Sequence, residues 1–283
     1  MMRSMGGLVH FLRTNKMAGF GVALLAFILI AVLVGPVLYE VSPTRLNILK
    51  RLAPPGPDFW LGTDSLGRDV LARLLHGGRV TLIVGCSVVA LAFAFGVTIG
   101  MISGFAGGWL DWFIMRLADA MLSFPSLVLA IALAAAFGPS LENAMLAVAI
   151  TLMPQFARVA RGQAISVSVK PYVDAAVTLG LPRRRILLRY VFANAVGPLM
   201  VQATLALGAA ILQTASLGFL GLGAQPPAAE WGADVSINLD FVRSAPWVAL
   251  VPGTGILLTV MAFNLIGDGL AEWMDPRRRP LIG

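Results

Sequence analysis

The sequence predicts an all-α membrane protein with six transmembrane helices. The 283 residues are 58% hydrophobic and 12% charged, with a mean hydropathy of +0.84, whereas soluble domains carry about a quarter charged residues. Uncharged runs recur along the chain, and most of them exceed the roughly 20 residues that a helix needs to cross the hydrocarbon core. The runs cover residues 17–39, 80–110, 120–141, 143–157, 190–229 and 244–267.

The first run, residues 17–39, follows a tail of residues 1–16 and predicts an uncleaved transmembrane helix. A signal peptide has an apolar core of about 7 to 15 residues and a small-residue cleavage site. This run is longer, and Gly35, Pro36 and Tyr39 do not form such a site. The only cysteine, Cys86, lies in the second run, so an intramolecular disulfide is excluded.

The loop of residues 40–79 predicts an amphipathic helix over Ser65–His76. Oppositely charged residues stand four apart in the pairs Asp64–Arg68 and Asp69–Arg73, and three leucines or valines share one stripe with the same spacing. Gly77-Gly78 would end this helix. We expect it to brace the outer headgroup layer, with contact to an external protein as the alternative.

Residues 80–267 form the predicted core, with five transmembrane helices. Gly96, Gly100 and Gly104 lie on one face of the second span, which favours close packing of a neighbouring helix over a role in lining a pore. The third span has a predicted kink at Ser123-Phe124-Pro125, because proline removes a backbone hydrogen bond. The fourth is short, with arginines that can snorkel from its end, and the fifth is followed by a Gly/Pro-rich loop.

Positive charges predict the orientation. Lysine and arginine concentrate on the cytoplasmic side of membrane proteins. They dominate the tail of residues 1–16, the segment 161–189 and the tail of residues 268–283, which six crossings place on one side. We therefore expect both termini to be cytoplasmic. The loop after the fifth span agrees, since acids outnumber bases there; the loop 40–79 carries mixed charge and is expected to be external.

The stretch PYVDAAVTLGLPRRRILLRY, residues 171–190, predicts a short helix and a basic second helix. Pro171 suits the first position of a helix, and Gly180 suits its left-handed end. A second helix then starts at Leu181-Pro182 and carries four arginines. Each arginine would cost roughly 2.5 to 3.5 kcal/mol at the bilayer centre, so the segment stays outside. A helix this short is marginal alone, so we expect it to dock on a partner; an ordinary basic cytoplasmic loop remains the alternative.

Other polar and aromatic residues have plain interpretations. An Asp119–Arg116 ion pair is favoured over a proton relay, and Asp268 is expected at the interface. The histidines His10 and His76 provide no basis for a His-rich metal site. The six tryptophans are expected in an aromatic belt near span ends; they are Trp60, Trp109, Trp112, Trp231, Trp247 and Trp273.

The short helix resembles the coupling segment of permease subunits in ATP-binding-cassette importers, whose pattern is Glu-Ala-Ala, three residues, Gly, nine residues, Ile-x-Leu-Pro. Asp174, Ala175, Ala176 and Gly180 match its first half. Alanine at position 193 replaces the proline of the second half, which leaves a bend there open. Four more stretches resemble the C-type permeases of the dipeptide, oligopeptide and nickel importers, namely WLGTDSLGRDVLARLLHGGRVTLIVG, GGWLDWFIMRLADAMLSFPSLVLA, SLGFLGLGAQPPAAEWG and LLTVMAFNLIGDGLAEWMDPR.

The resemblance implies a type I importer permease in a bacterial inner membrane. Its partners would be a second homologous membrane subunit, two cytoplasmic ATPase subunits and an external solute-binding protein, and it would contact membrane lipid. Its cargo would be di- or oligopeptides. Its ATPase-coupling residues would be Asp174, Ala175, Ala176 and Gly180. ATP and Mg would be bound by the ATPase subunits, with no cofactor in this chain, which has no Gly-x-x-x-x-Gly-Lys-Ser/Thr loop.

Competing functions differ in the features they require. A nickel or other small-solute permease of the same family fits the same sequence. An ion-coupled secondary transporter would usually show internal repeats with broken helices, and we see none. An intramembrane hydrolase needs a nucleophile with a base nearby, which Cys86 lacks. The net charge of +7 follows the membrane pattern and does not predict nucleic-acid binding.

Overall fold

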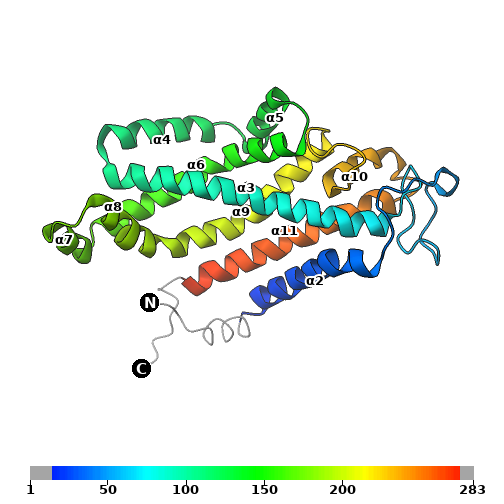
Figure 1. Cartoon of the computed structure of the whole chain (residues 1–283), viewed down its shortest axis with the longest axis horizontal. Helices are drawn as coiled ribbons and strands as arrows, with labels where there is room; N and C mark the ends of the chain where they lie inside the picture. Colours follow the sequence, from blue (N-terminus) through cyan, green and yellow to red (C-terminus); the bar gives the residue numbers. More distant parts are fainter. Residues whose placement is uncertain (1–14, 275–283) are drawn as a thin grey trace.

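The computed structural model describes residues 15–274, and its regular elements are helices that run mostly along one long axis (Figure 1). Within these residues, five helices are long and apolar enough to cross a membrane. A bent helix pair makes up to six spans if it counts as one. The expected all-α fold with six spans is therefore confirmed. Residues 1–14 and 275–283 lie outside the described residues, and with them most of the cations predicted in the two tails.

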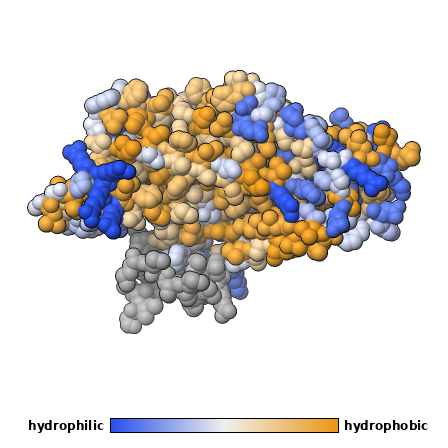
Figure 2. Space-filling model, viewed as in Figure 1, coloured by the Kyte–Doolittle hydropathy of each residue, from blue (hydrophilic) through white to orange (hydrophobic). Residues whose placement is uncertain are grey.

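The molecule has two chemically different ends. We call the end that carries α7 (Pro171–Thr178) and α8 (Arg183–Ile186) the coupling end, and the opposite end, with residues 40–69 and α10 (Trp231–Ile237), the loop end (Figure 1). Hydrophilic residues gather largely at these two ends, and hydrophobic residues cover the middle (Figure 2). This distribution matches a bilayer that surrounds the middle of the bundle.

Helix α2 spans Lys16–Leu38, capped by the Asn15 side chain. Toward the coupling end it touches α11 (Trp247–Met274), where a Cβ at Gly21 would lie only 2.8 Å from the Cβ of Leu265. Toward the loop end it contains Pro36, which has no N–H to bond the Val32 carbonyl. The Arg79 guanidinium donates to that carbonyl instead, with 2.6 Å between Nε and O.

Helix α3 spans Val70–Ala106, and it corrects the predicted amphipathic helix of the loop. Residues 65–68 form a turn, the helix begins after Asp69, and it continues through Gly77-Gly78 into the second span. The two glycines do not end the helix. They are buried beneath the Trp231 ring, which leaves no room for larger side chains there.

The glycine face predicted for the second span is confirmed as a packing face. Helix α6 (Leu141–Ser168) lies against it, and a Cβ at Gly96 would be 2.5 Å from the Met153 carbonyl oxygen. A Cβ at Gly104 would be 2.6 Å from the Arg161 carbonyl oxygen. The absence of side chains therefore lets the two backbones approach closely.

The predicted kink in the third span is confirmed as a sharp turn. Helix α4 (Gly108–Leu122) and helix α5 (Ser126–Phe137) meet at Pro125 and differ in direction by 93°. This pair begins earlier and ends earlier than the uncharged run at residues 120–141. The predicted Asp119–Arg116 pair is wrong, because Asp119 pairs with Arg158 of α6 at 2.5 Å. Arg116 lies over the Trp112 ring instead.

The remaining elements complete the bundle. Helix α6 extends to Ser168, so Arg161 belongs to a helix and pairs with Asp111 of α4 at 2.6 Å, although it was expected in the coupling loop. A π-helical stretch, η2 (Leu187–Phe192), joins α8 to α9 (Ala193–Phe219). Short 3-10 turns, η1 (Ile48–Lys50) and η3 (Leu239–Phe241), lie in the two loops at the loop end.

Candidate coupling site

Helix α7 has the start that the sequence predicts. Its first residue is Pro171, whose missing N–H needs no partner at this position. Asp174 lies in the first turn, where a negative charge interacts favourably with the unpaired N–H groups of the helix start. The helix has eight residues, so its stability depends on packing against the bundle.

The end of α7 is a Schellman motif. The N–H of Gly180 donates to the Val177 carbonyl at 2.9 Å, and the N–H of Leu181 donates to the Ala176 carbonyl at 3.2 Å. Gly180 has φ +72°, the left-handed region that glycine enters without strain. A Cβ at this position would meet nothing within 4 Å, so glycine is required here for backbone conformation and not for space.

The two faces of α7 differ in burial. Val173 and Ala176 are buried, both 3% exposed, and join the main hydrophobic core. Three apolar residues around the helix and at its C-terminal end are exposed, namely Tyr172, Val177 and Leu179. Leu179 is 79% exposed, next to the hydrophilic coupling end. We call these three residues the α7 apolar face.

The structure places the four predicted coupling residues on one short segment but in different environments. Asp174, Ala175 and Gly180 are exposed, whereas Ala176 is buried against the bundle. Ala176 therefore holds α7 in place, because its small side chain and its carbonyl both serve internal contacts. The apolar side chains that project outward are those of the α7 apolar face, and the family motif does not include them.

The basic helix after α7 is a surface element, as predicted. Arg183, Arg184, Arg185 and Arg189 are exposed, and within residues 15–274 no ion pair joins them to a carboxylate. Ile186 and Val191 anchor the segment in the core. The chain shows no bend at Ala193, which has helical φ −57° and ψ −30°. Instead η2 widens the helix locally as the chain enters the bundle.

A buried ionic network at the loop end was missed by sequence reasoning. Arg68 pairs with Asp64 at 2.6 Å, as predicted, but inside a turn. Arg73 does not pair with Asp69; its Nε donates to Asp234 of α10 at 2.9 Å. Asp69 instead caps α3 and accepts from the Tyr39 hydroxyl at 2.7 Å.

The network is largely out of water, and burial raises the pKa of three groups at this end of the molecule. Burial raises the pKa of Asp234 to about 6, although Arg73 opposes that shift. Burial, together with the hydrogen bond to Asp69, raises the pKa of Tyr39 to about 12, so this hydroxyl stays a donor. Burial also raises the pKa of Glu230, whose carboxylate accepts from two N–H groups at the start of α10.

Trp231 is not part of an aromatic belt, contrary to expectation. It is 2% exposed, and its Nε1–H donates to the Leu74 carbonyl at 2.9 Å. Its neighbour Glu230 fixes the start of α10, so the indole is held between α3 and α11. Sequence spacing could not show this, because the tryptophan follows a loop and its position depends on long-range contacts.

A bundle of membrane-spanning helices with a short, partly exposed helix at one end defines a multi-pass membrane protein. Comparison with known proteins identifies its family. Residues 96–280 match the model of the binding-protein-dependent transport system inner membrane component, and residues 8–55 match the N-terminal transmembrane domain of oligopeptide transport permease C. The chain belongs to this family of inner-membrane transport permeases.

Several curated relatives are similar over most of their length. The dipeptide transport system permease protein DppC of Alkalihalophilus pseudofirmus is 45% identical over 269 residues, which is 95% of this chain and 88% of that protein. The probable D,D-dipeptide transport system permease protein DdpC of Escherichia coli is 44% identical over 95% of this chain and 91% of its own. The glutathione transport system permease protein GsiD of Pectobacterium atrosepticum is 41% identical, over 79% and 74%.

Proposed function

We propose that this permease subunit forms half of a path that imports di- or oligopeptides, driven by ATP hydrolysis on partner subunits. The relatives at 44 to 45% identity are named as dipeptide or D,D-dipeptide permeases, and glutathione, named in a third relative, is itself a small peptide. This agreement on peptide-like cargo supports peptides over nickel. The partners proposed are a second homologous permease, two cytoplasmic ATPases and an external solute-binding protein.

The α7 apolar face carries the proposal of coupling. A cytoplasmic helix that exposes Tyr172, Val177 and Leu179 offers apolar surface that water does not favour and that a groove on an ATPase can cover. The buried residues Val173 and Ala176 fix α7 to the bundle core. A force applied to α7 by a closing ATPase pair would therefore reach α6 and α8 directly.

The proposed orientation in the membrane rests on the arginines of the coupling end. The exposed arginines of the coupling end favour the cytoplasmic side, where the ATPases bind nucleotide. We therefore place α7, α8 and both termini in the cytoplasm, and the loop end outside. A reporter fused within residues 53–58 should be accessible from the outer side of the inner membrane.

The coupling proposal is tested with the complete transporter in vesicles, with ATP inside and the binding protein outside. Leu179→Glu places a charge on the α7 apolar face without disturbing the bundle, because the side chain is 79% exposed. We expect this variant to lose ATPase subunits on purification and to lose uptake. Leu49→Glu, at a 98% exposed leucine of the loop end, is the matched control and should retain its ATPases. Normal ATPase binding and uptake in Leu179→Glu would overturn the coupling role.

The cargo is tested separately in the same vesicles. Uptake of a labelled dipeptide that depends on ATP and the binding protein is the expected result. Uptake of nickel without uptake of dipeptides would overturn the peptide proposal and leave the coupling proposal intact. The two proposals therefore fail by different measurements.

A further inference from the structure

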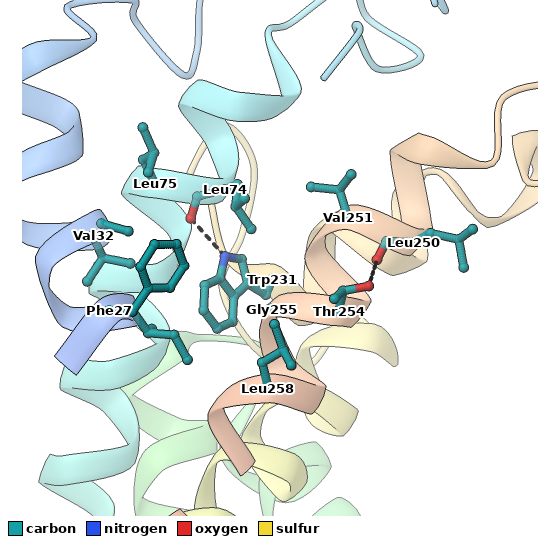
Figure 3. A pocket seen from close by; sticks show the side chains of 12 residues that line it. Phe27, Val32, Leu74, Leu75, Trp231, Leu250, Val251, Thr254, Gly255 and Leu258 are labelled. Atoms are coloured by element: carbon teal, nitrogen blue, oxygen red, sulfur yellow. Dashed lines mark hydrogen bonds between the residues drawn. The ribbon is translucent and has the colours of Figure 1, made fainter. Parts of the chain in front are cut away.

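A cleft of about 320 Å³ opens between α2 and α11 near the loop end. It exists because α2 changes neighbours along its length. Near Gly21 it packs on α11, whereas near Gly35 it packs on Leu75 of α3. The two helices leave a wedge between them, and the indole of Trp231 closes its back (Figure 3).

The depth of the cleft in the membrane can be worked out from both walls. On α2 the lining residues lie in the segment 27–32, about 9 to 17 Å from the end of the helix at Leu38. On α11 they lie in the segment 250–258, about 5 to 17 Å from its start at Trp247. Half of a hydrocarbon core is about 15 Å. With the ends of both helices taken as the edge of the hydrocarbon core, both walls place most of the cleft in one leaflet.

The walls present hydrocarbon and no free hydrogen-bonding side chain. Thr254 is the one lining residue with a hydroxyl, and that hydroxyl donates to the Leu250 carbonyl at 2.7 Å. The indole N–H of Trp231 is bonded to the Leu74 carbonyl (Figure 3). The lips are apolar as well, since Phe27 and Leu250 are 68% and 61% exposed. A peptide or a lipid headgroup would find no partner here, so the cleft suits an acyl chain.

We propose that this cleft binds one acyl chain of a membrane phospholipid as an ordered ligand. The chain enters between Phe27 and Leu250, lies along α2 and α11, and ends against the Trp231 ring. In the proposed orientation the lipid belongs to the outer leaflet, but the site does not depend on cargo or on ATPase coupling. Because Trp231 begins α10, the lipid contacts the element that anchors the buried ionic network.

The bound chain stabilises the attachment of α2. In its absence, α2 and α11 would face each other across an unfilled wedge, which loses the dispersion contacts of both walls. A filled cleft joins α2, α11 and α10 into one packed unit. Short or removed acyl chains should therefore loosen α2 before the rest of the bundle.

Photo-crosslinking in the intact transporter tests the proposal. The complex is placed in phosphatidylethanolamine and phosphatidylglycerol vesicles that contain a trace of phosphatidylcholine with a diazirine in the middle of one acyl chain. After illumination, labelled peptides are mapped by mass spectrometry. We expect label to concentrate in the segments 27–32 and 250–258 above the level found around Phe95, an apolar residue of α3 outside the cleft that is 60% exposed.

Matched variants decide whether the cleft is responsible. Ala31→Phe fills the cleft from α2, and label in both segments should fall to the Phe95 level. Ala26→Phe adds the same side chain at an exposed position of α2 outside the cleft and should leave the labelling unchanged. Thr254→Phe fills the cleft from the opposite wall, in case Ala31→Phe does not assemble. Unchanged labelling in both filling variants, or an even distribution of label over all exposed spans, would overturn the proposal.

Discussion

Arg79 is predicted to satisfy a backbone carbonyl that proline frees inside a transmembrane helix. Pro36 cannot donate to the Val32 carbonyl, and the Arg79 Nε lies 2.6 Å from that oxygen. The guanidinium Nη2 also donates to the Leu33 carbonyl at 2.5 Å, but Leu33 can still be bonded by the N–H of Val37. Replacing Arg79 by methionine keeps apolar contact and leaves only the Val32 carbonyl without a donor.

The size of the effect follows from burial and from the membrane setting. Val32 is 3% exposed, so water does not replace the lost donor. An unsatisfied buried polar group costs about 1 to 3 kcal/mol, while hydrogen bonds between membrane helices average about 0.6 and reach about 1.7 kcal/mol. Because the donor is charged and the acceptor has no helical partner, we expect Arg79→Met to lower the free energy of unfolding by about 1 to 2 kcal/mol.

A double-mutant cycle isolates this interaction. Pro36→Ala restores an N–H to the Val32 carbonyl, so Arg79→Met should cost well under 1 kcal/mol in that background. Unfolding is followed by titration with sodium dodecyl sulfate in mixed micelles. Arg189→Met, at an exposed arginine of the coupling end, controls for loss of charge and should change little. An equal cost of Arg79→Met with and without Pro36 would refute the reasoning.

Three further predictions concern other parts of the bundle. Gly180→Ala should lower the stability of α7 by about 1 to 2 kcal/mol, because alanine is strained at φ +72°. Faster proteolysis after α7 and slower uptake would show this loss of stability, and Gly180→Asn should cause a smaller loss. Gly100→Val should prevent assembly of the protein or sharply lower its melting temperature, because the added Cβ would overlap the Ala157 carbonyl of α6. An unchanged melting temperature would contradict the close packing of α3 on α6. The raised pKa of Asp234 means that the folded state binds the proton more tightly than the unfolded chain, so the stability from this group should fall as the pH rises through about 6. Asp234→Asn should flatten that pH profile, and an unchanged profile would count against burial as its cause.

Local sequence patterns predicted the structural elements that depend on neighbouring residues alone. Uncharged runs predict spans because each run must exclude charge over the thickness of the bilayer. The start and end of α7 follow from Pro171 and Gly180 because both residues act on their own backbone. The face formed by Gly96, Gly100 and Gly104 was predictable for a similar reason, since helical spacing alone puts small residues on one side.

The sequence alone determined that this protein is an all-helical membrane permease with a short helix outside the bilayer. Tertiary structure decided which charges pair, because Arg73 and Asp234 are 161 residues apart in sequence and meet at 2.9 Å only after α10 folds back onto α3. It also decided that Trp231 is buried, and that a cleft remains where α2 leaves α11 for α3. Hydrophobicity and backbone preference act over one or two helical turns, whereas pairing and packing depend on the path of the whole chain.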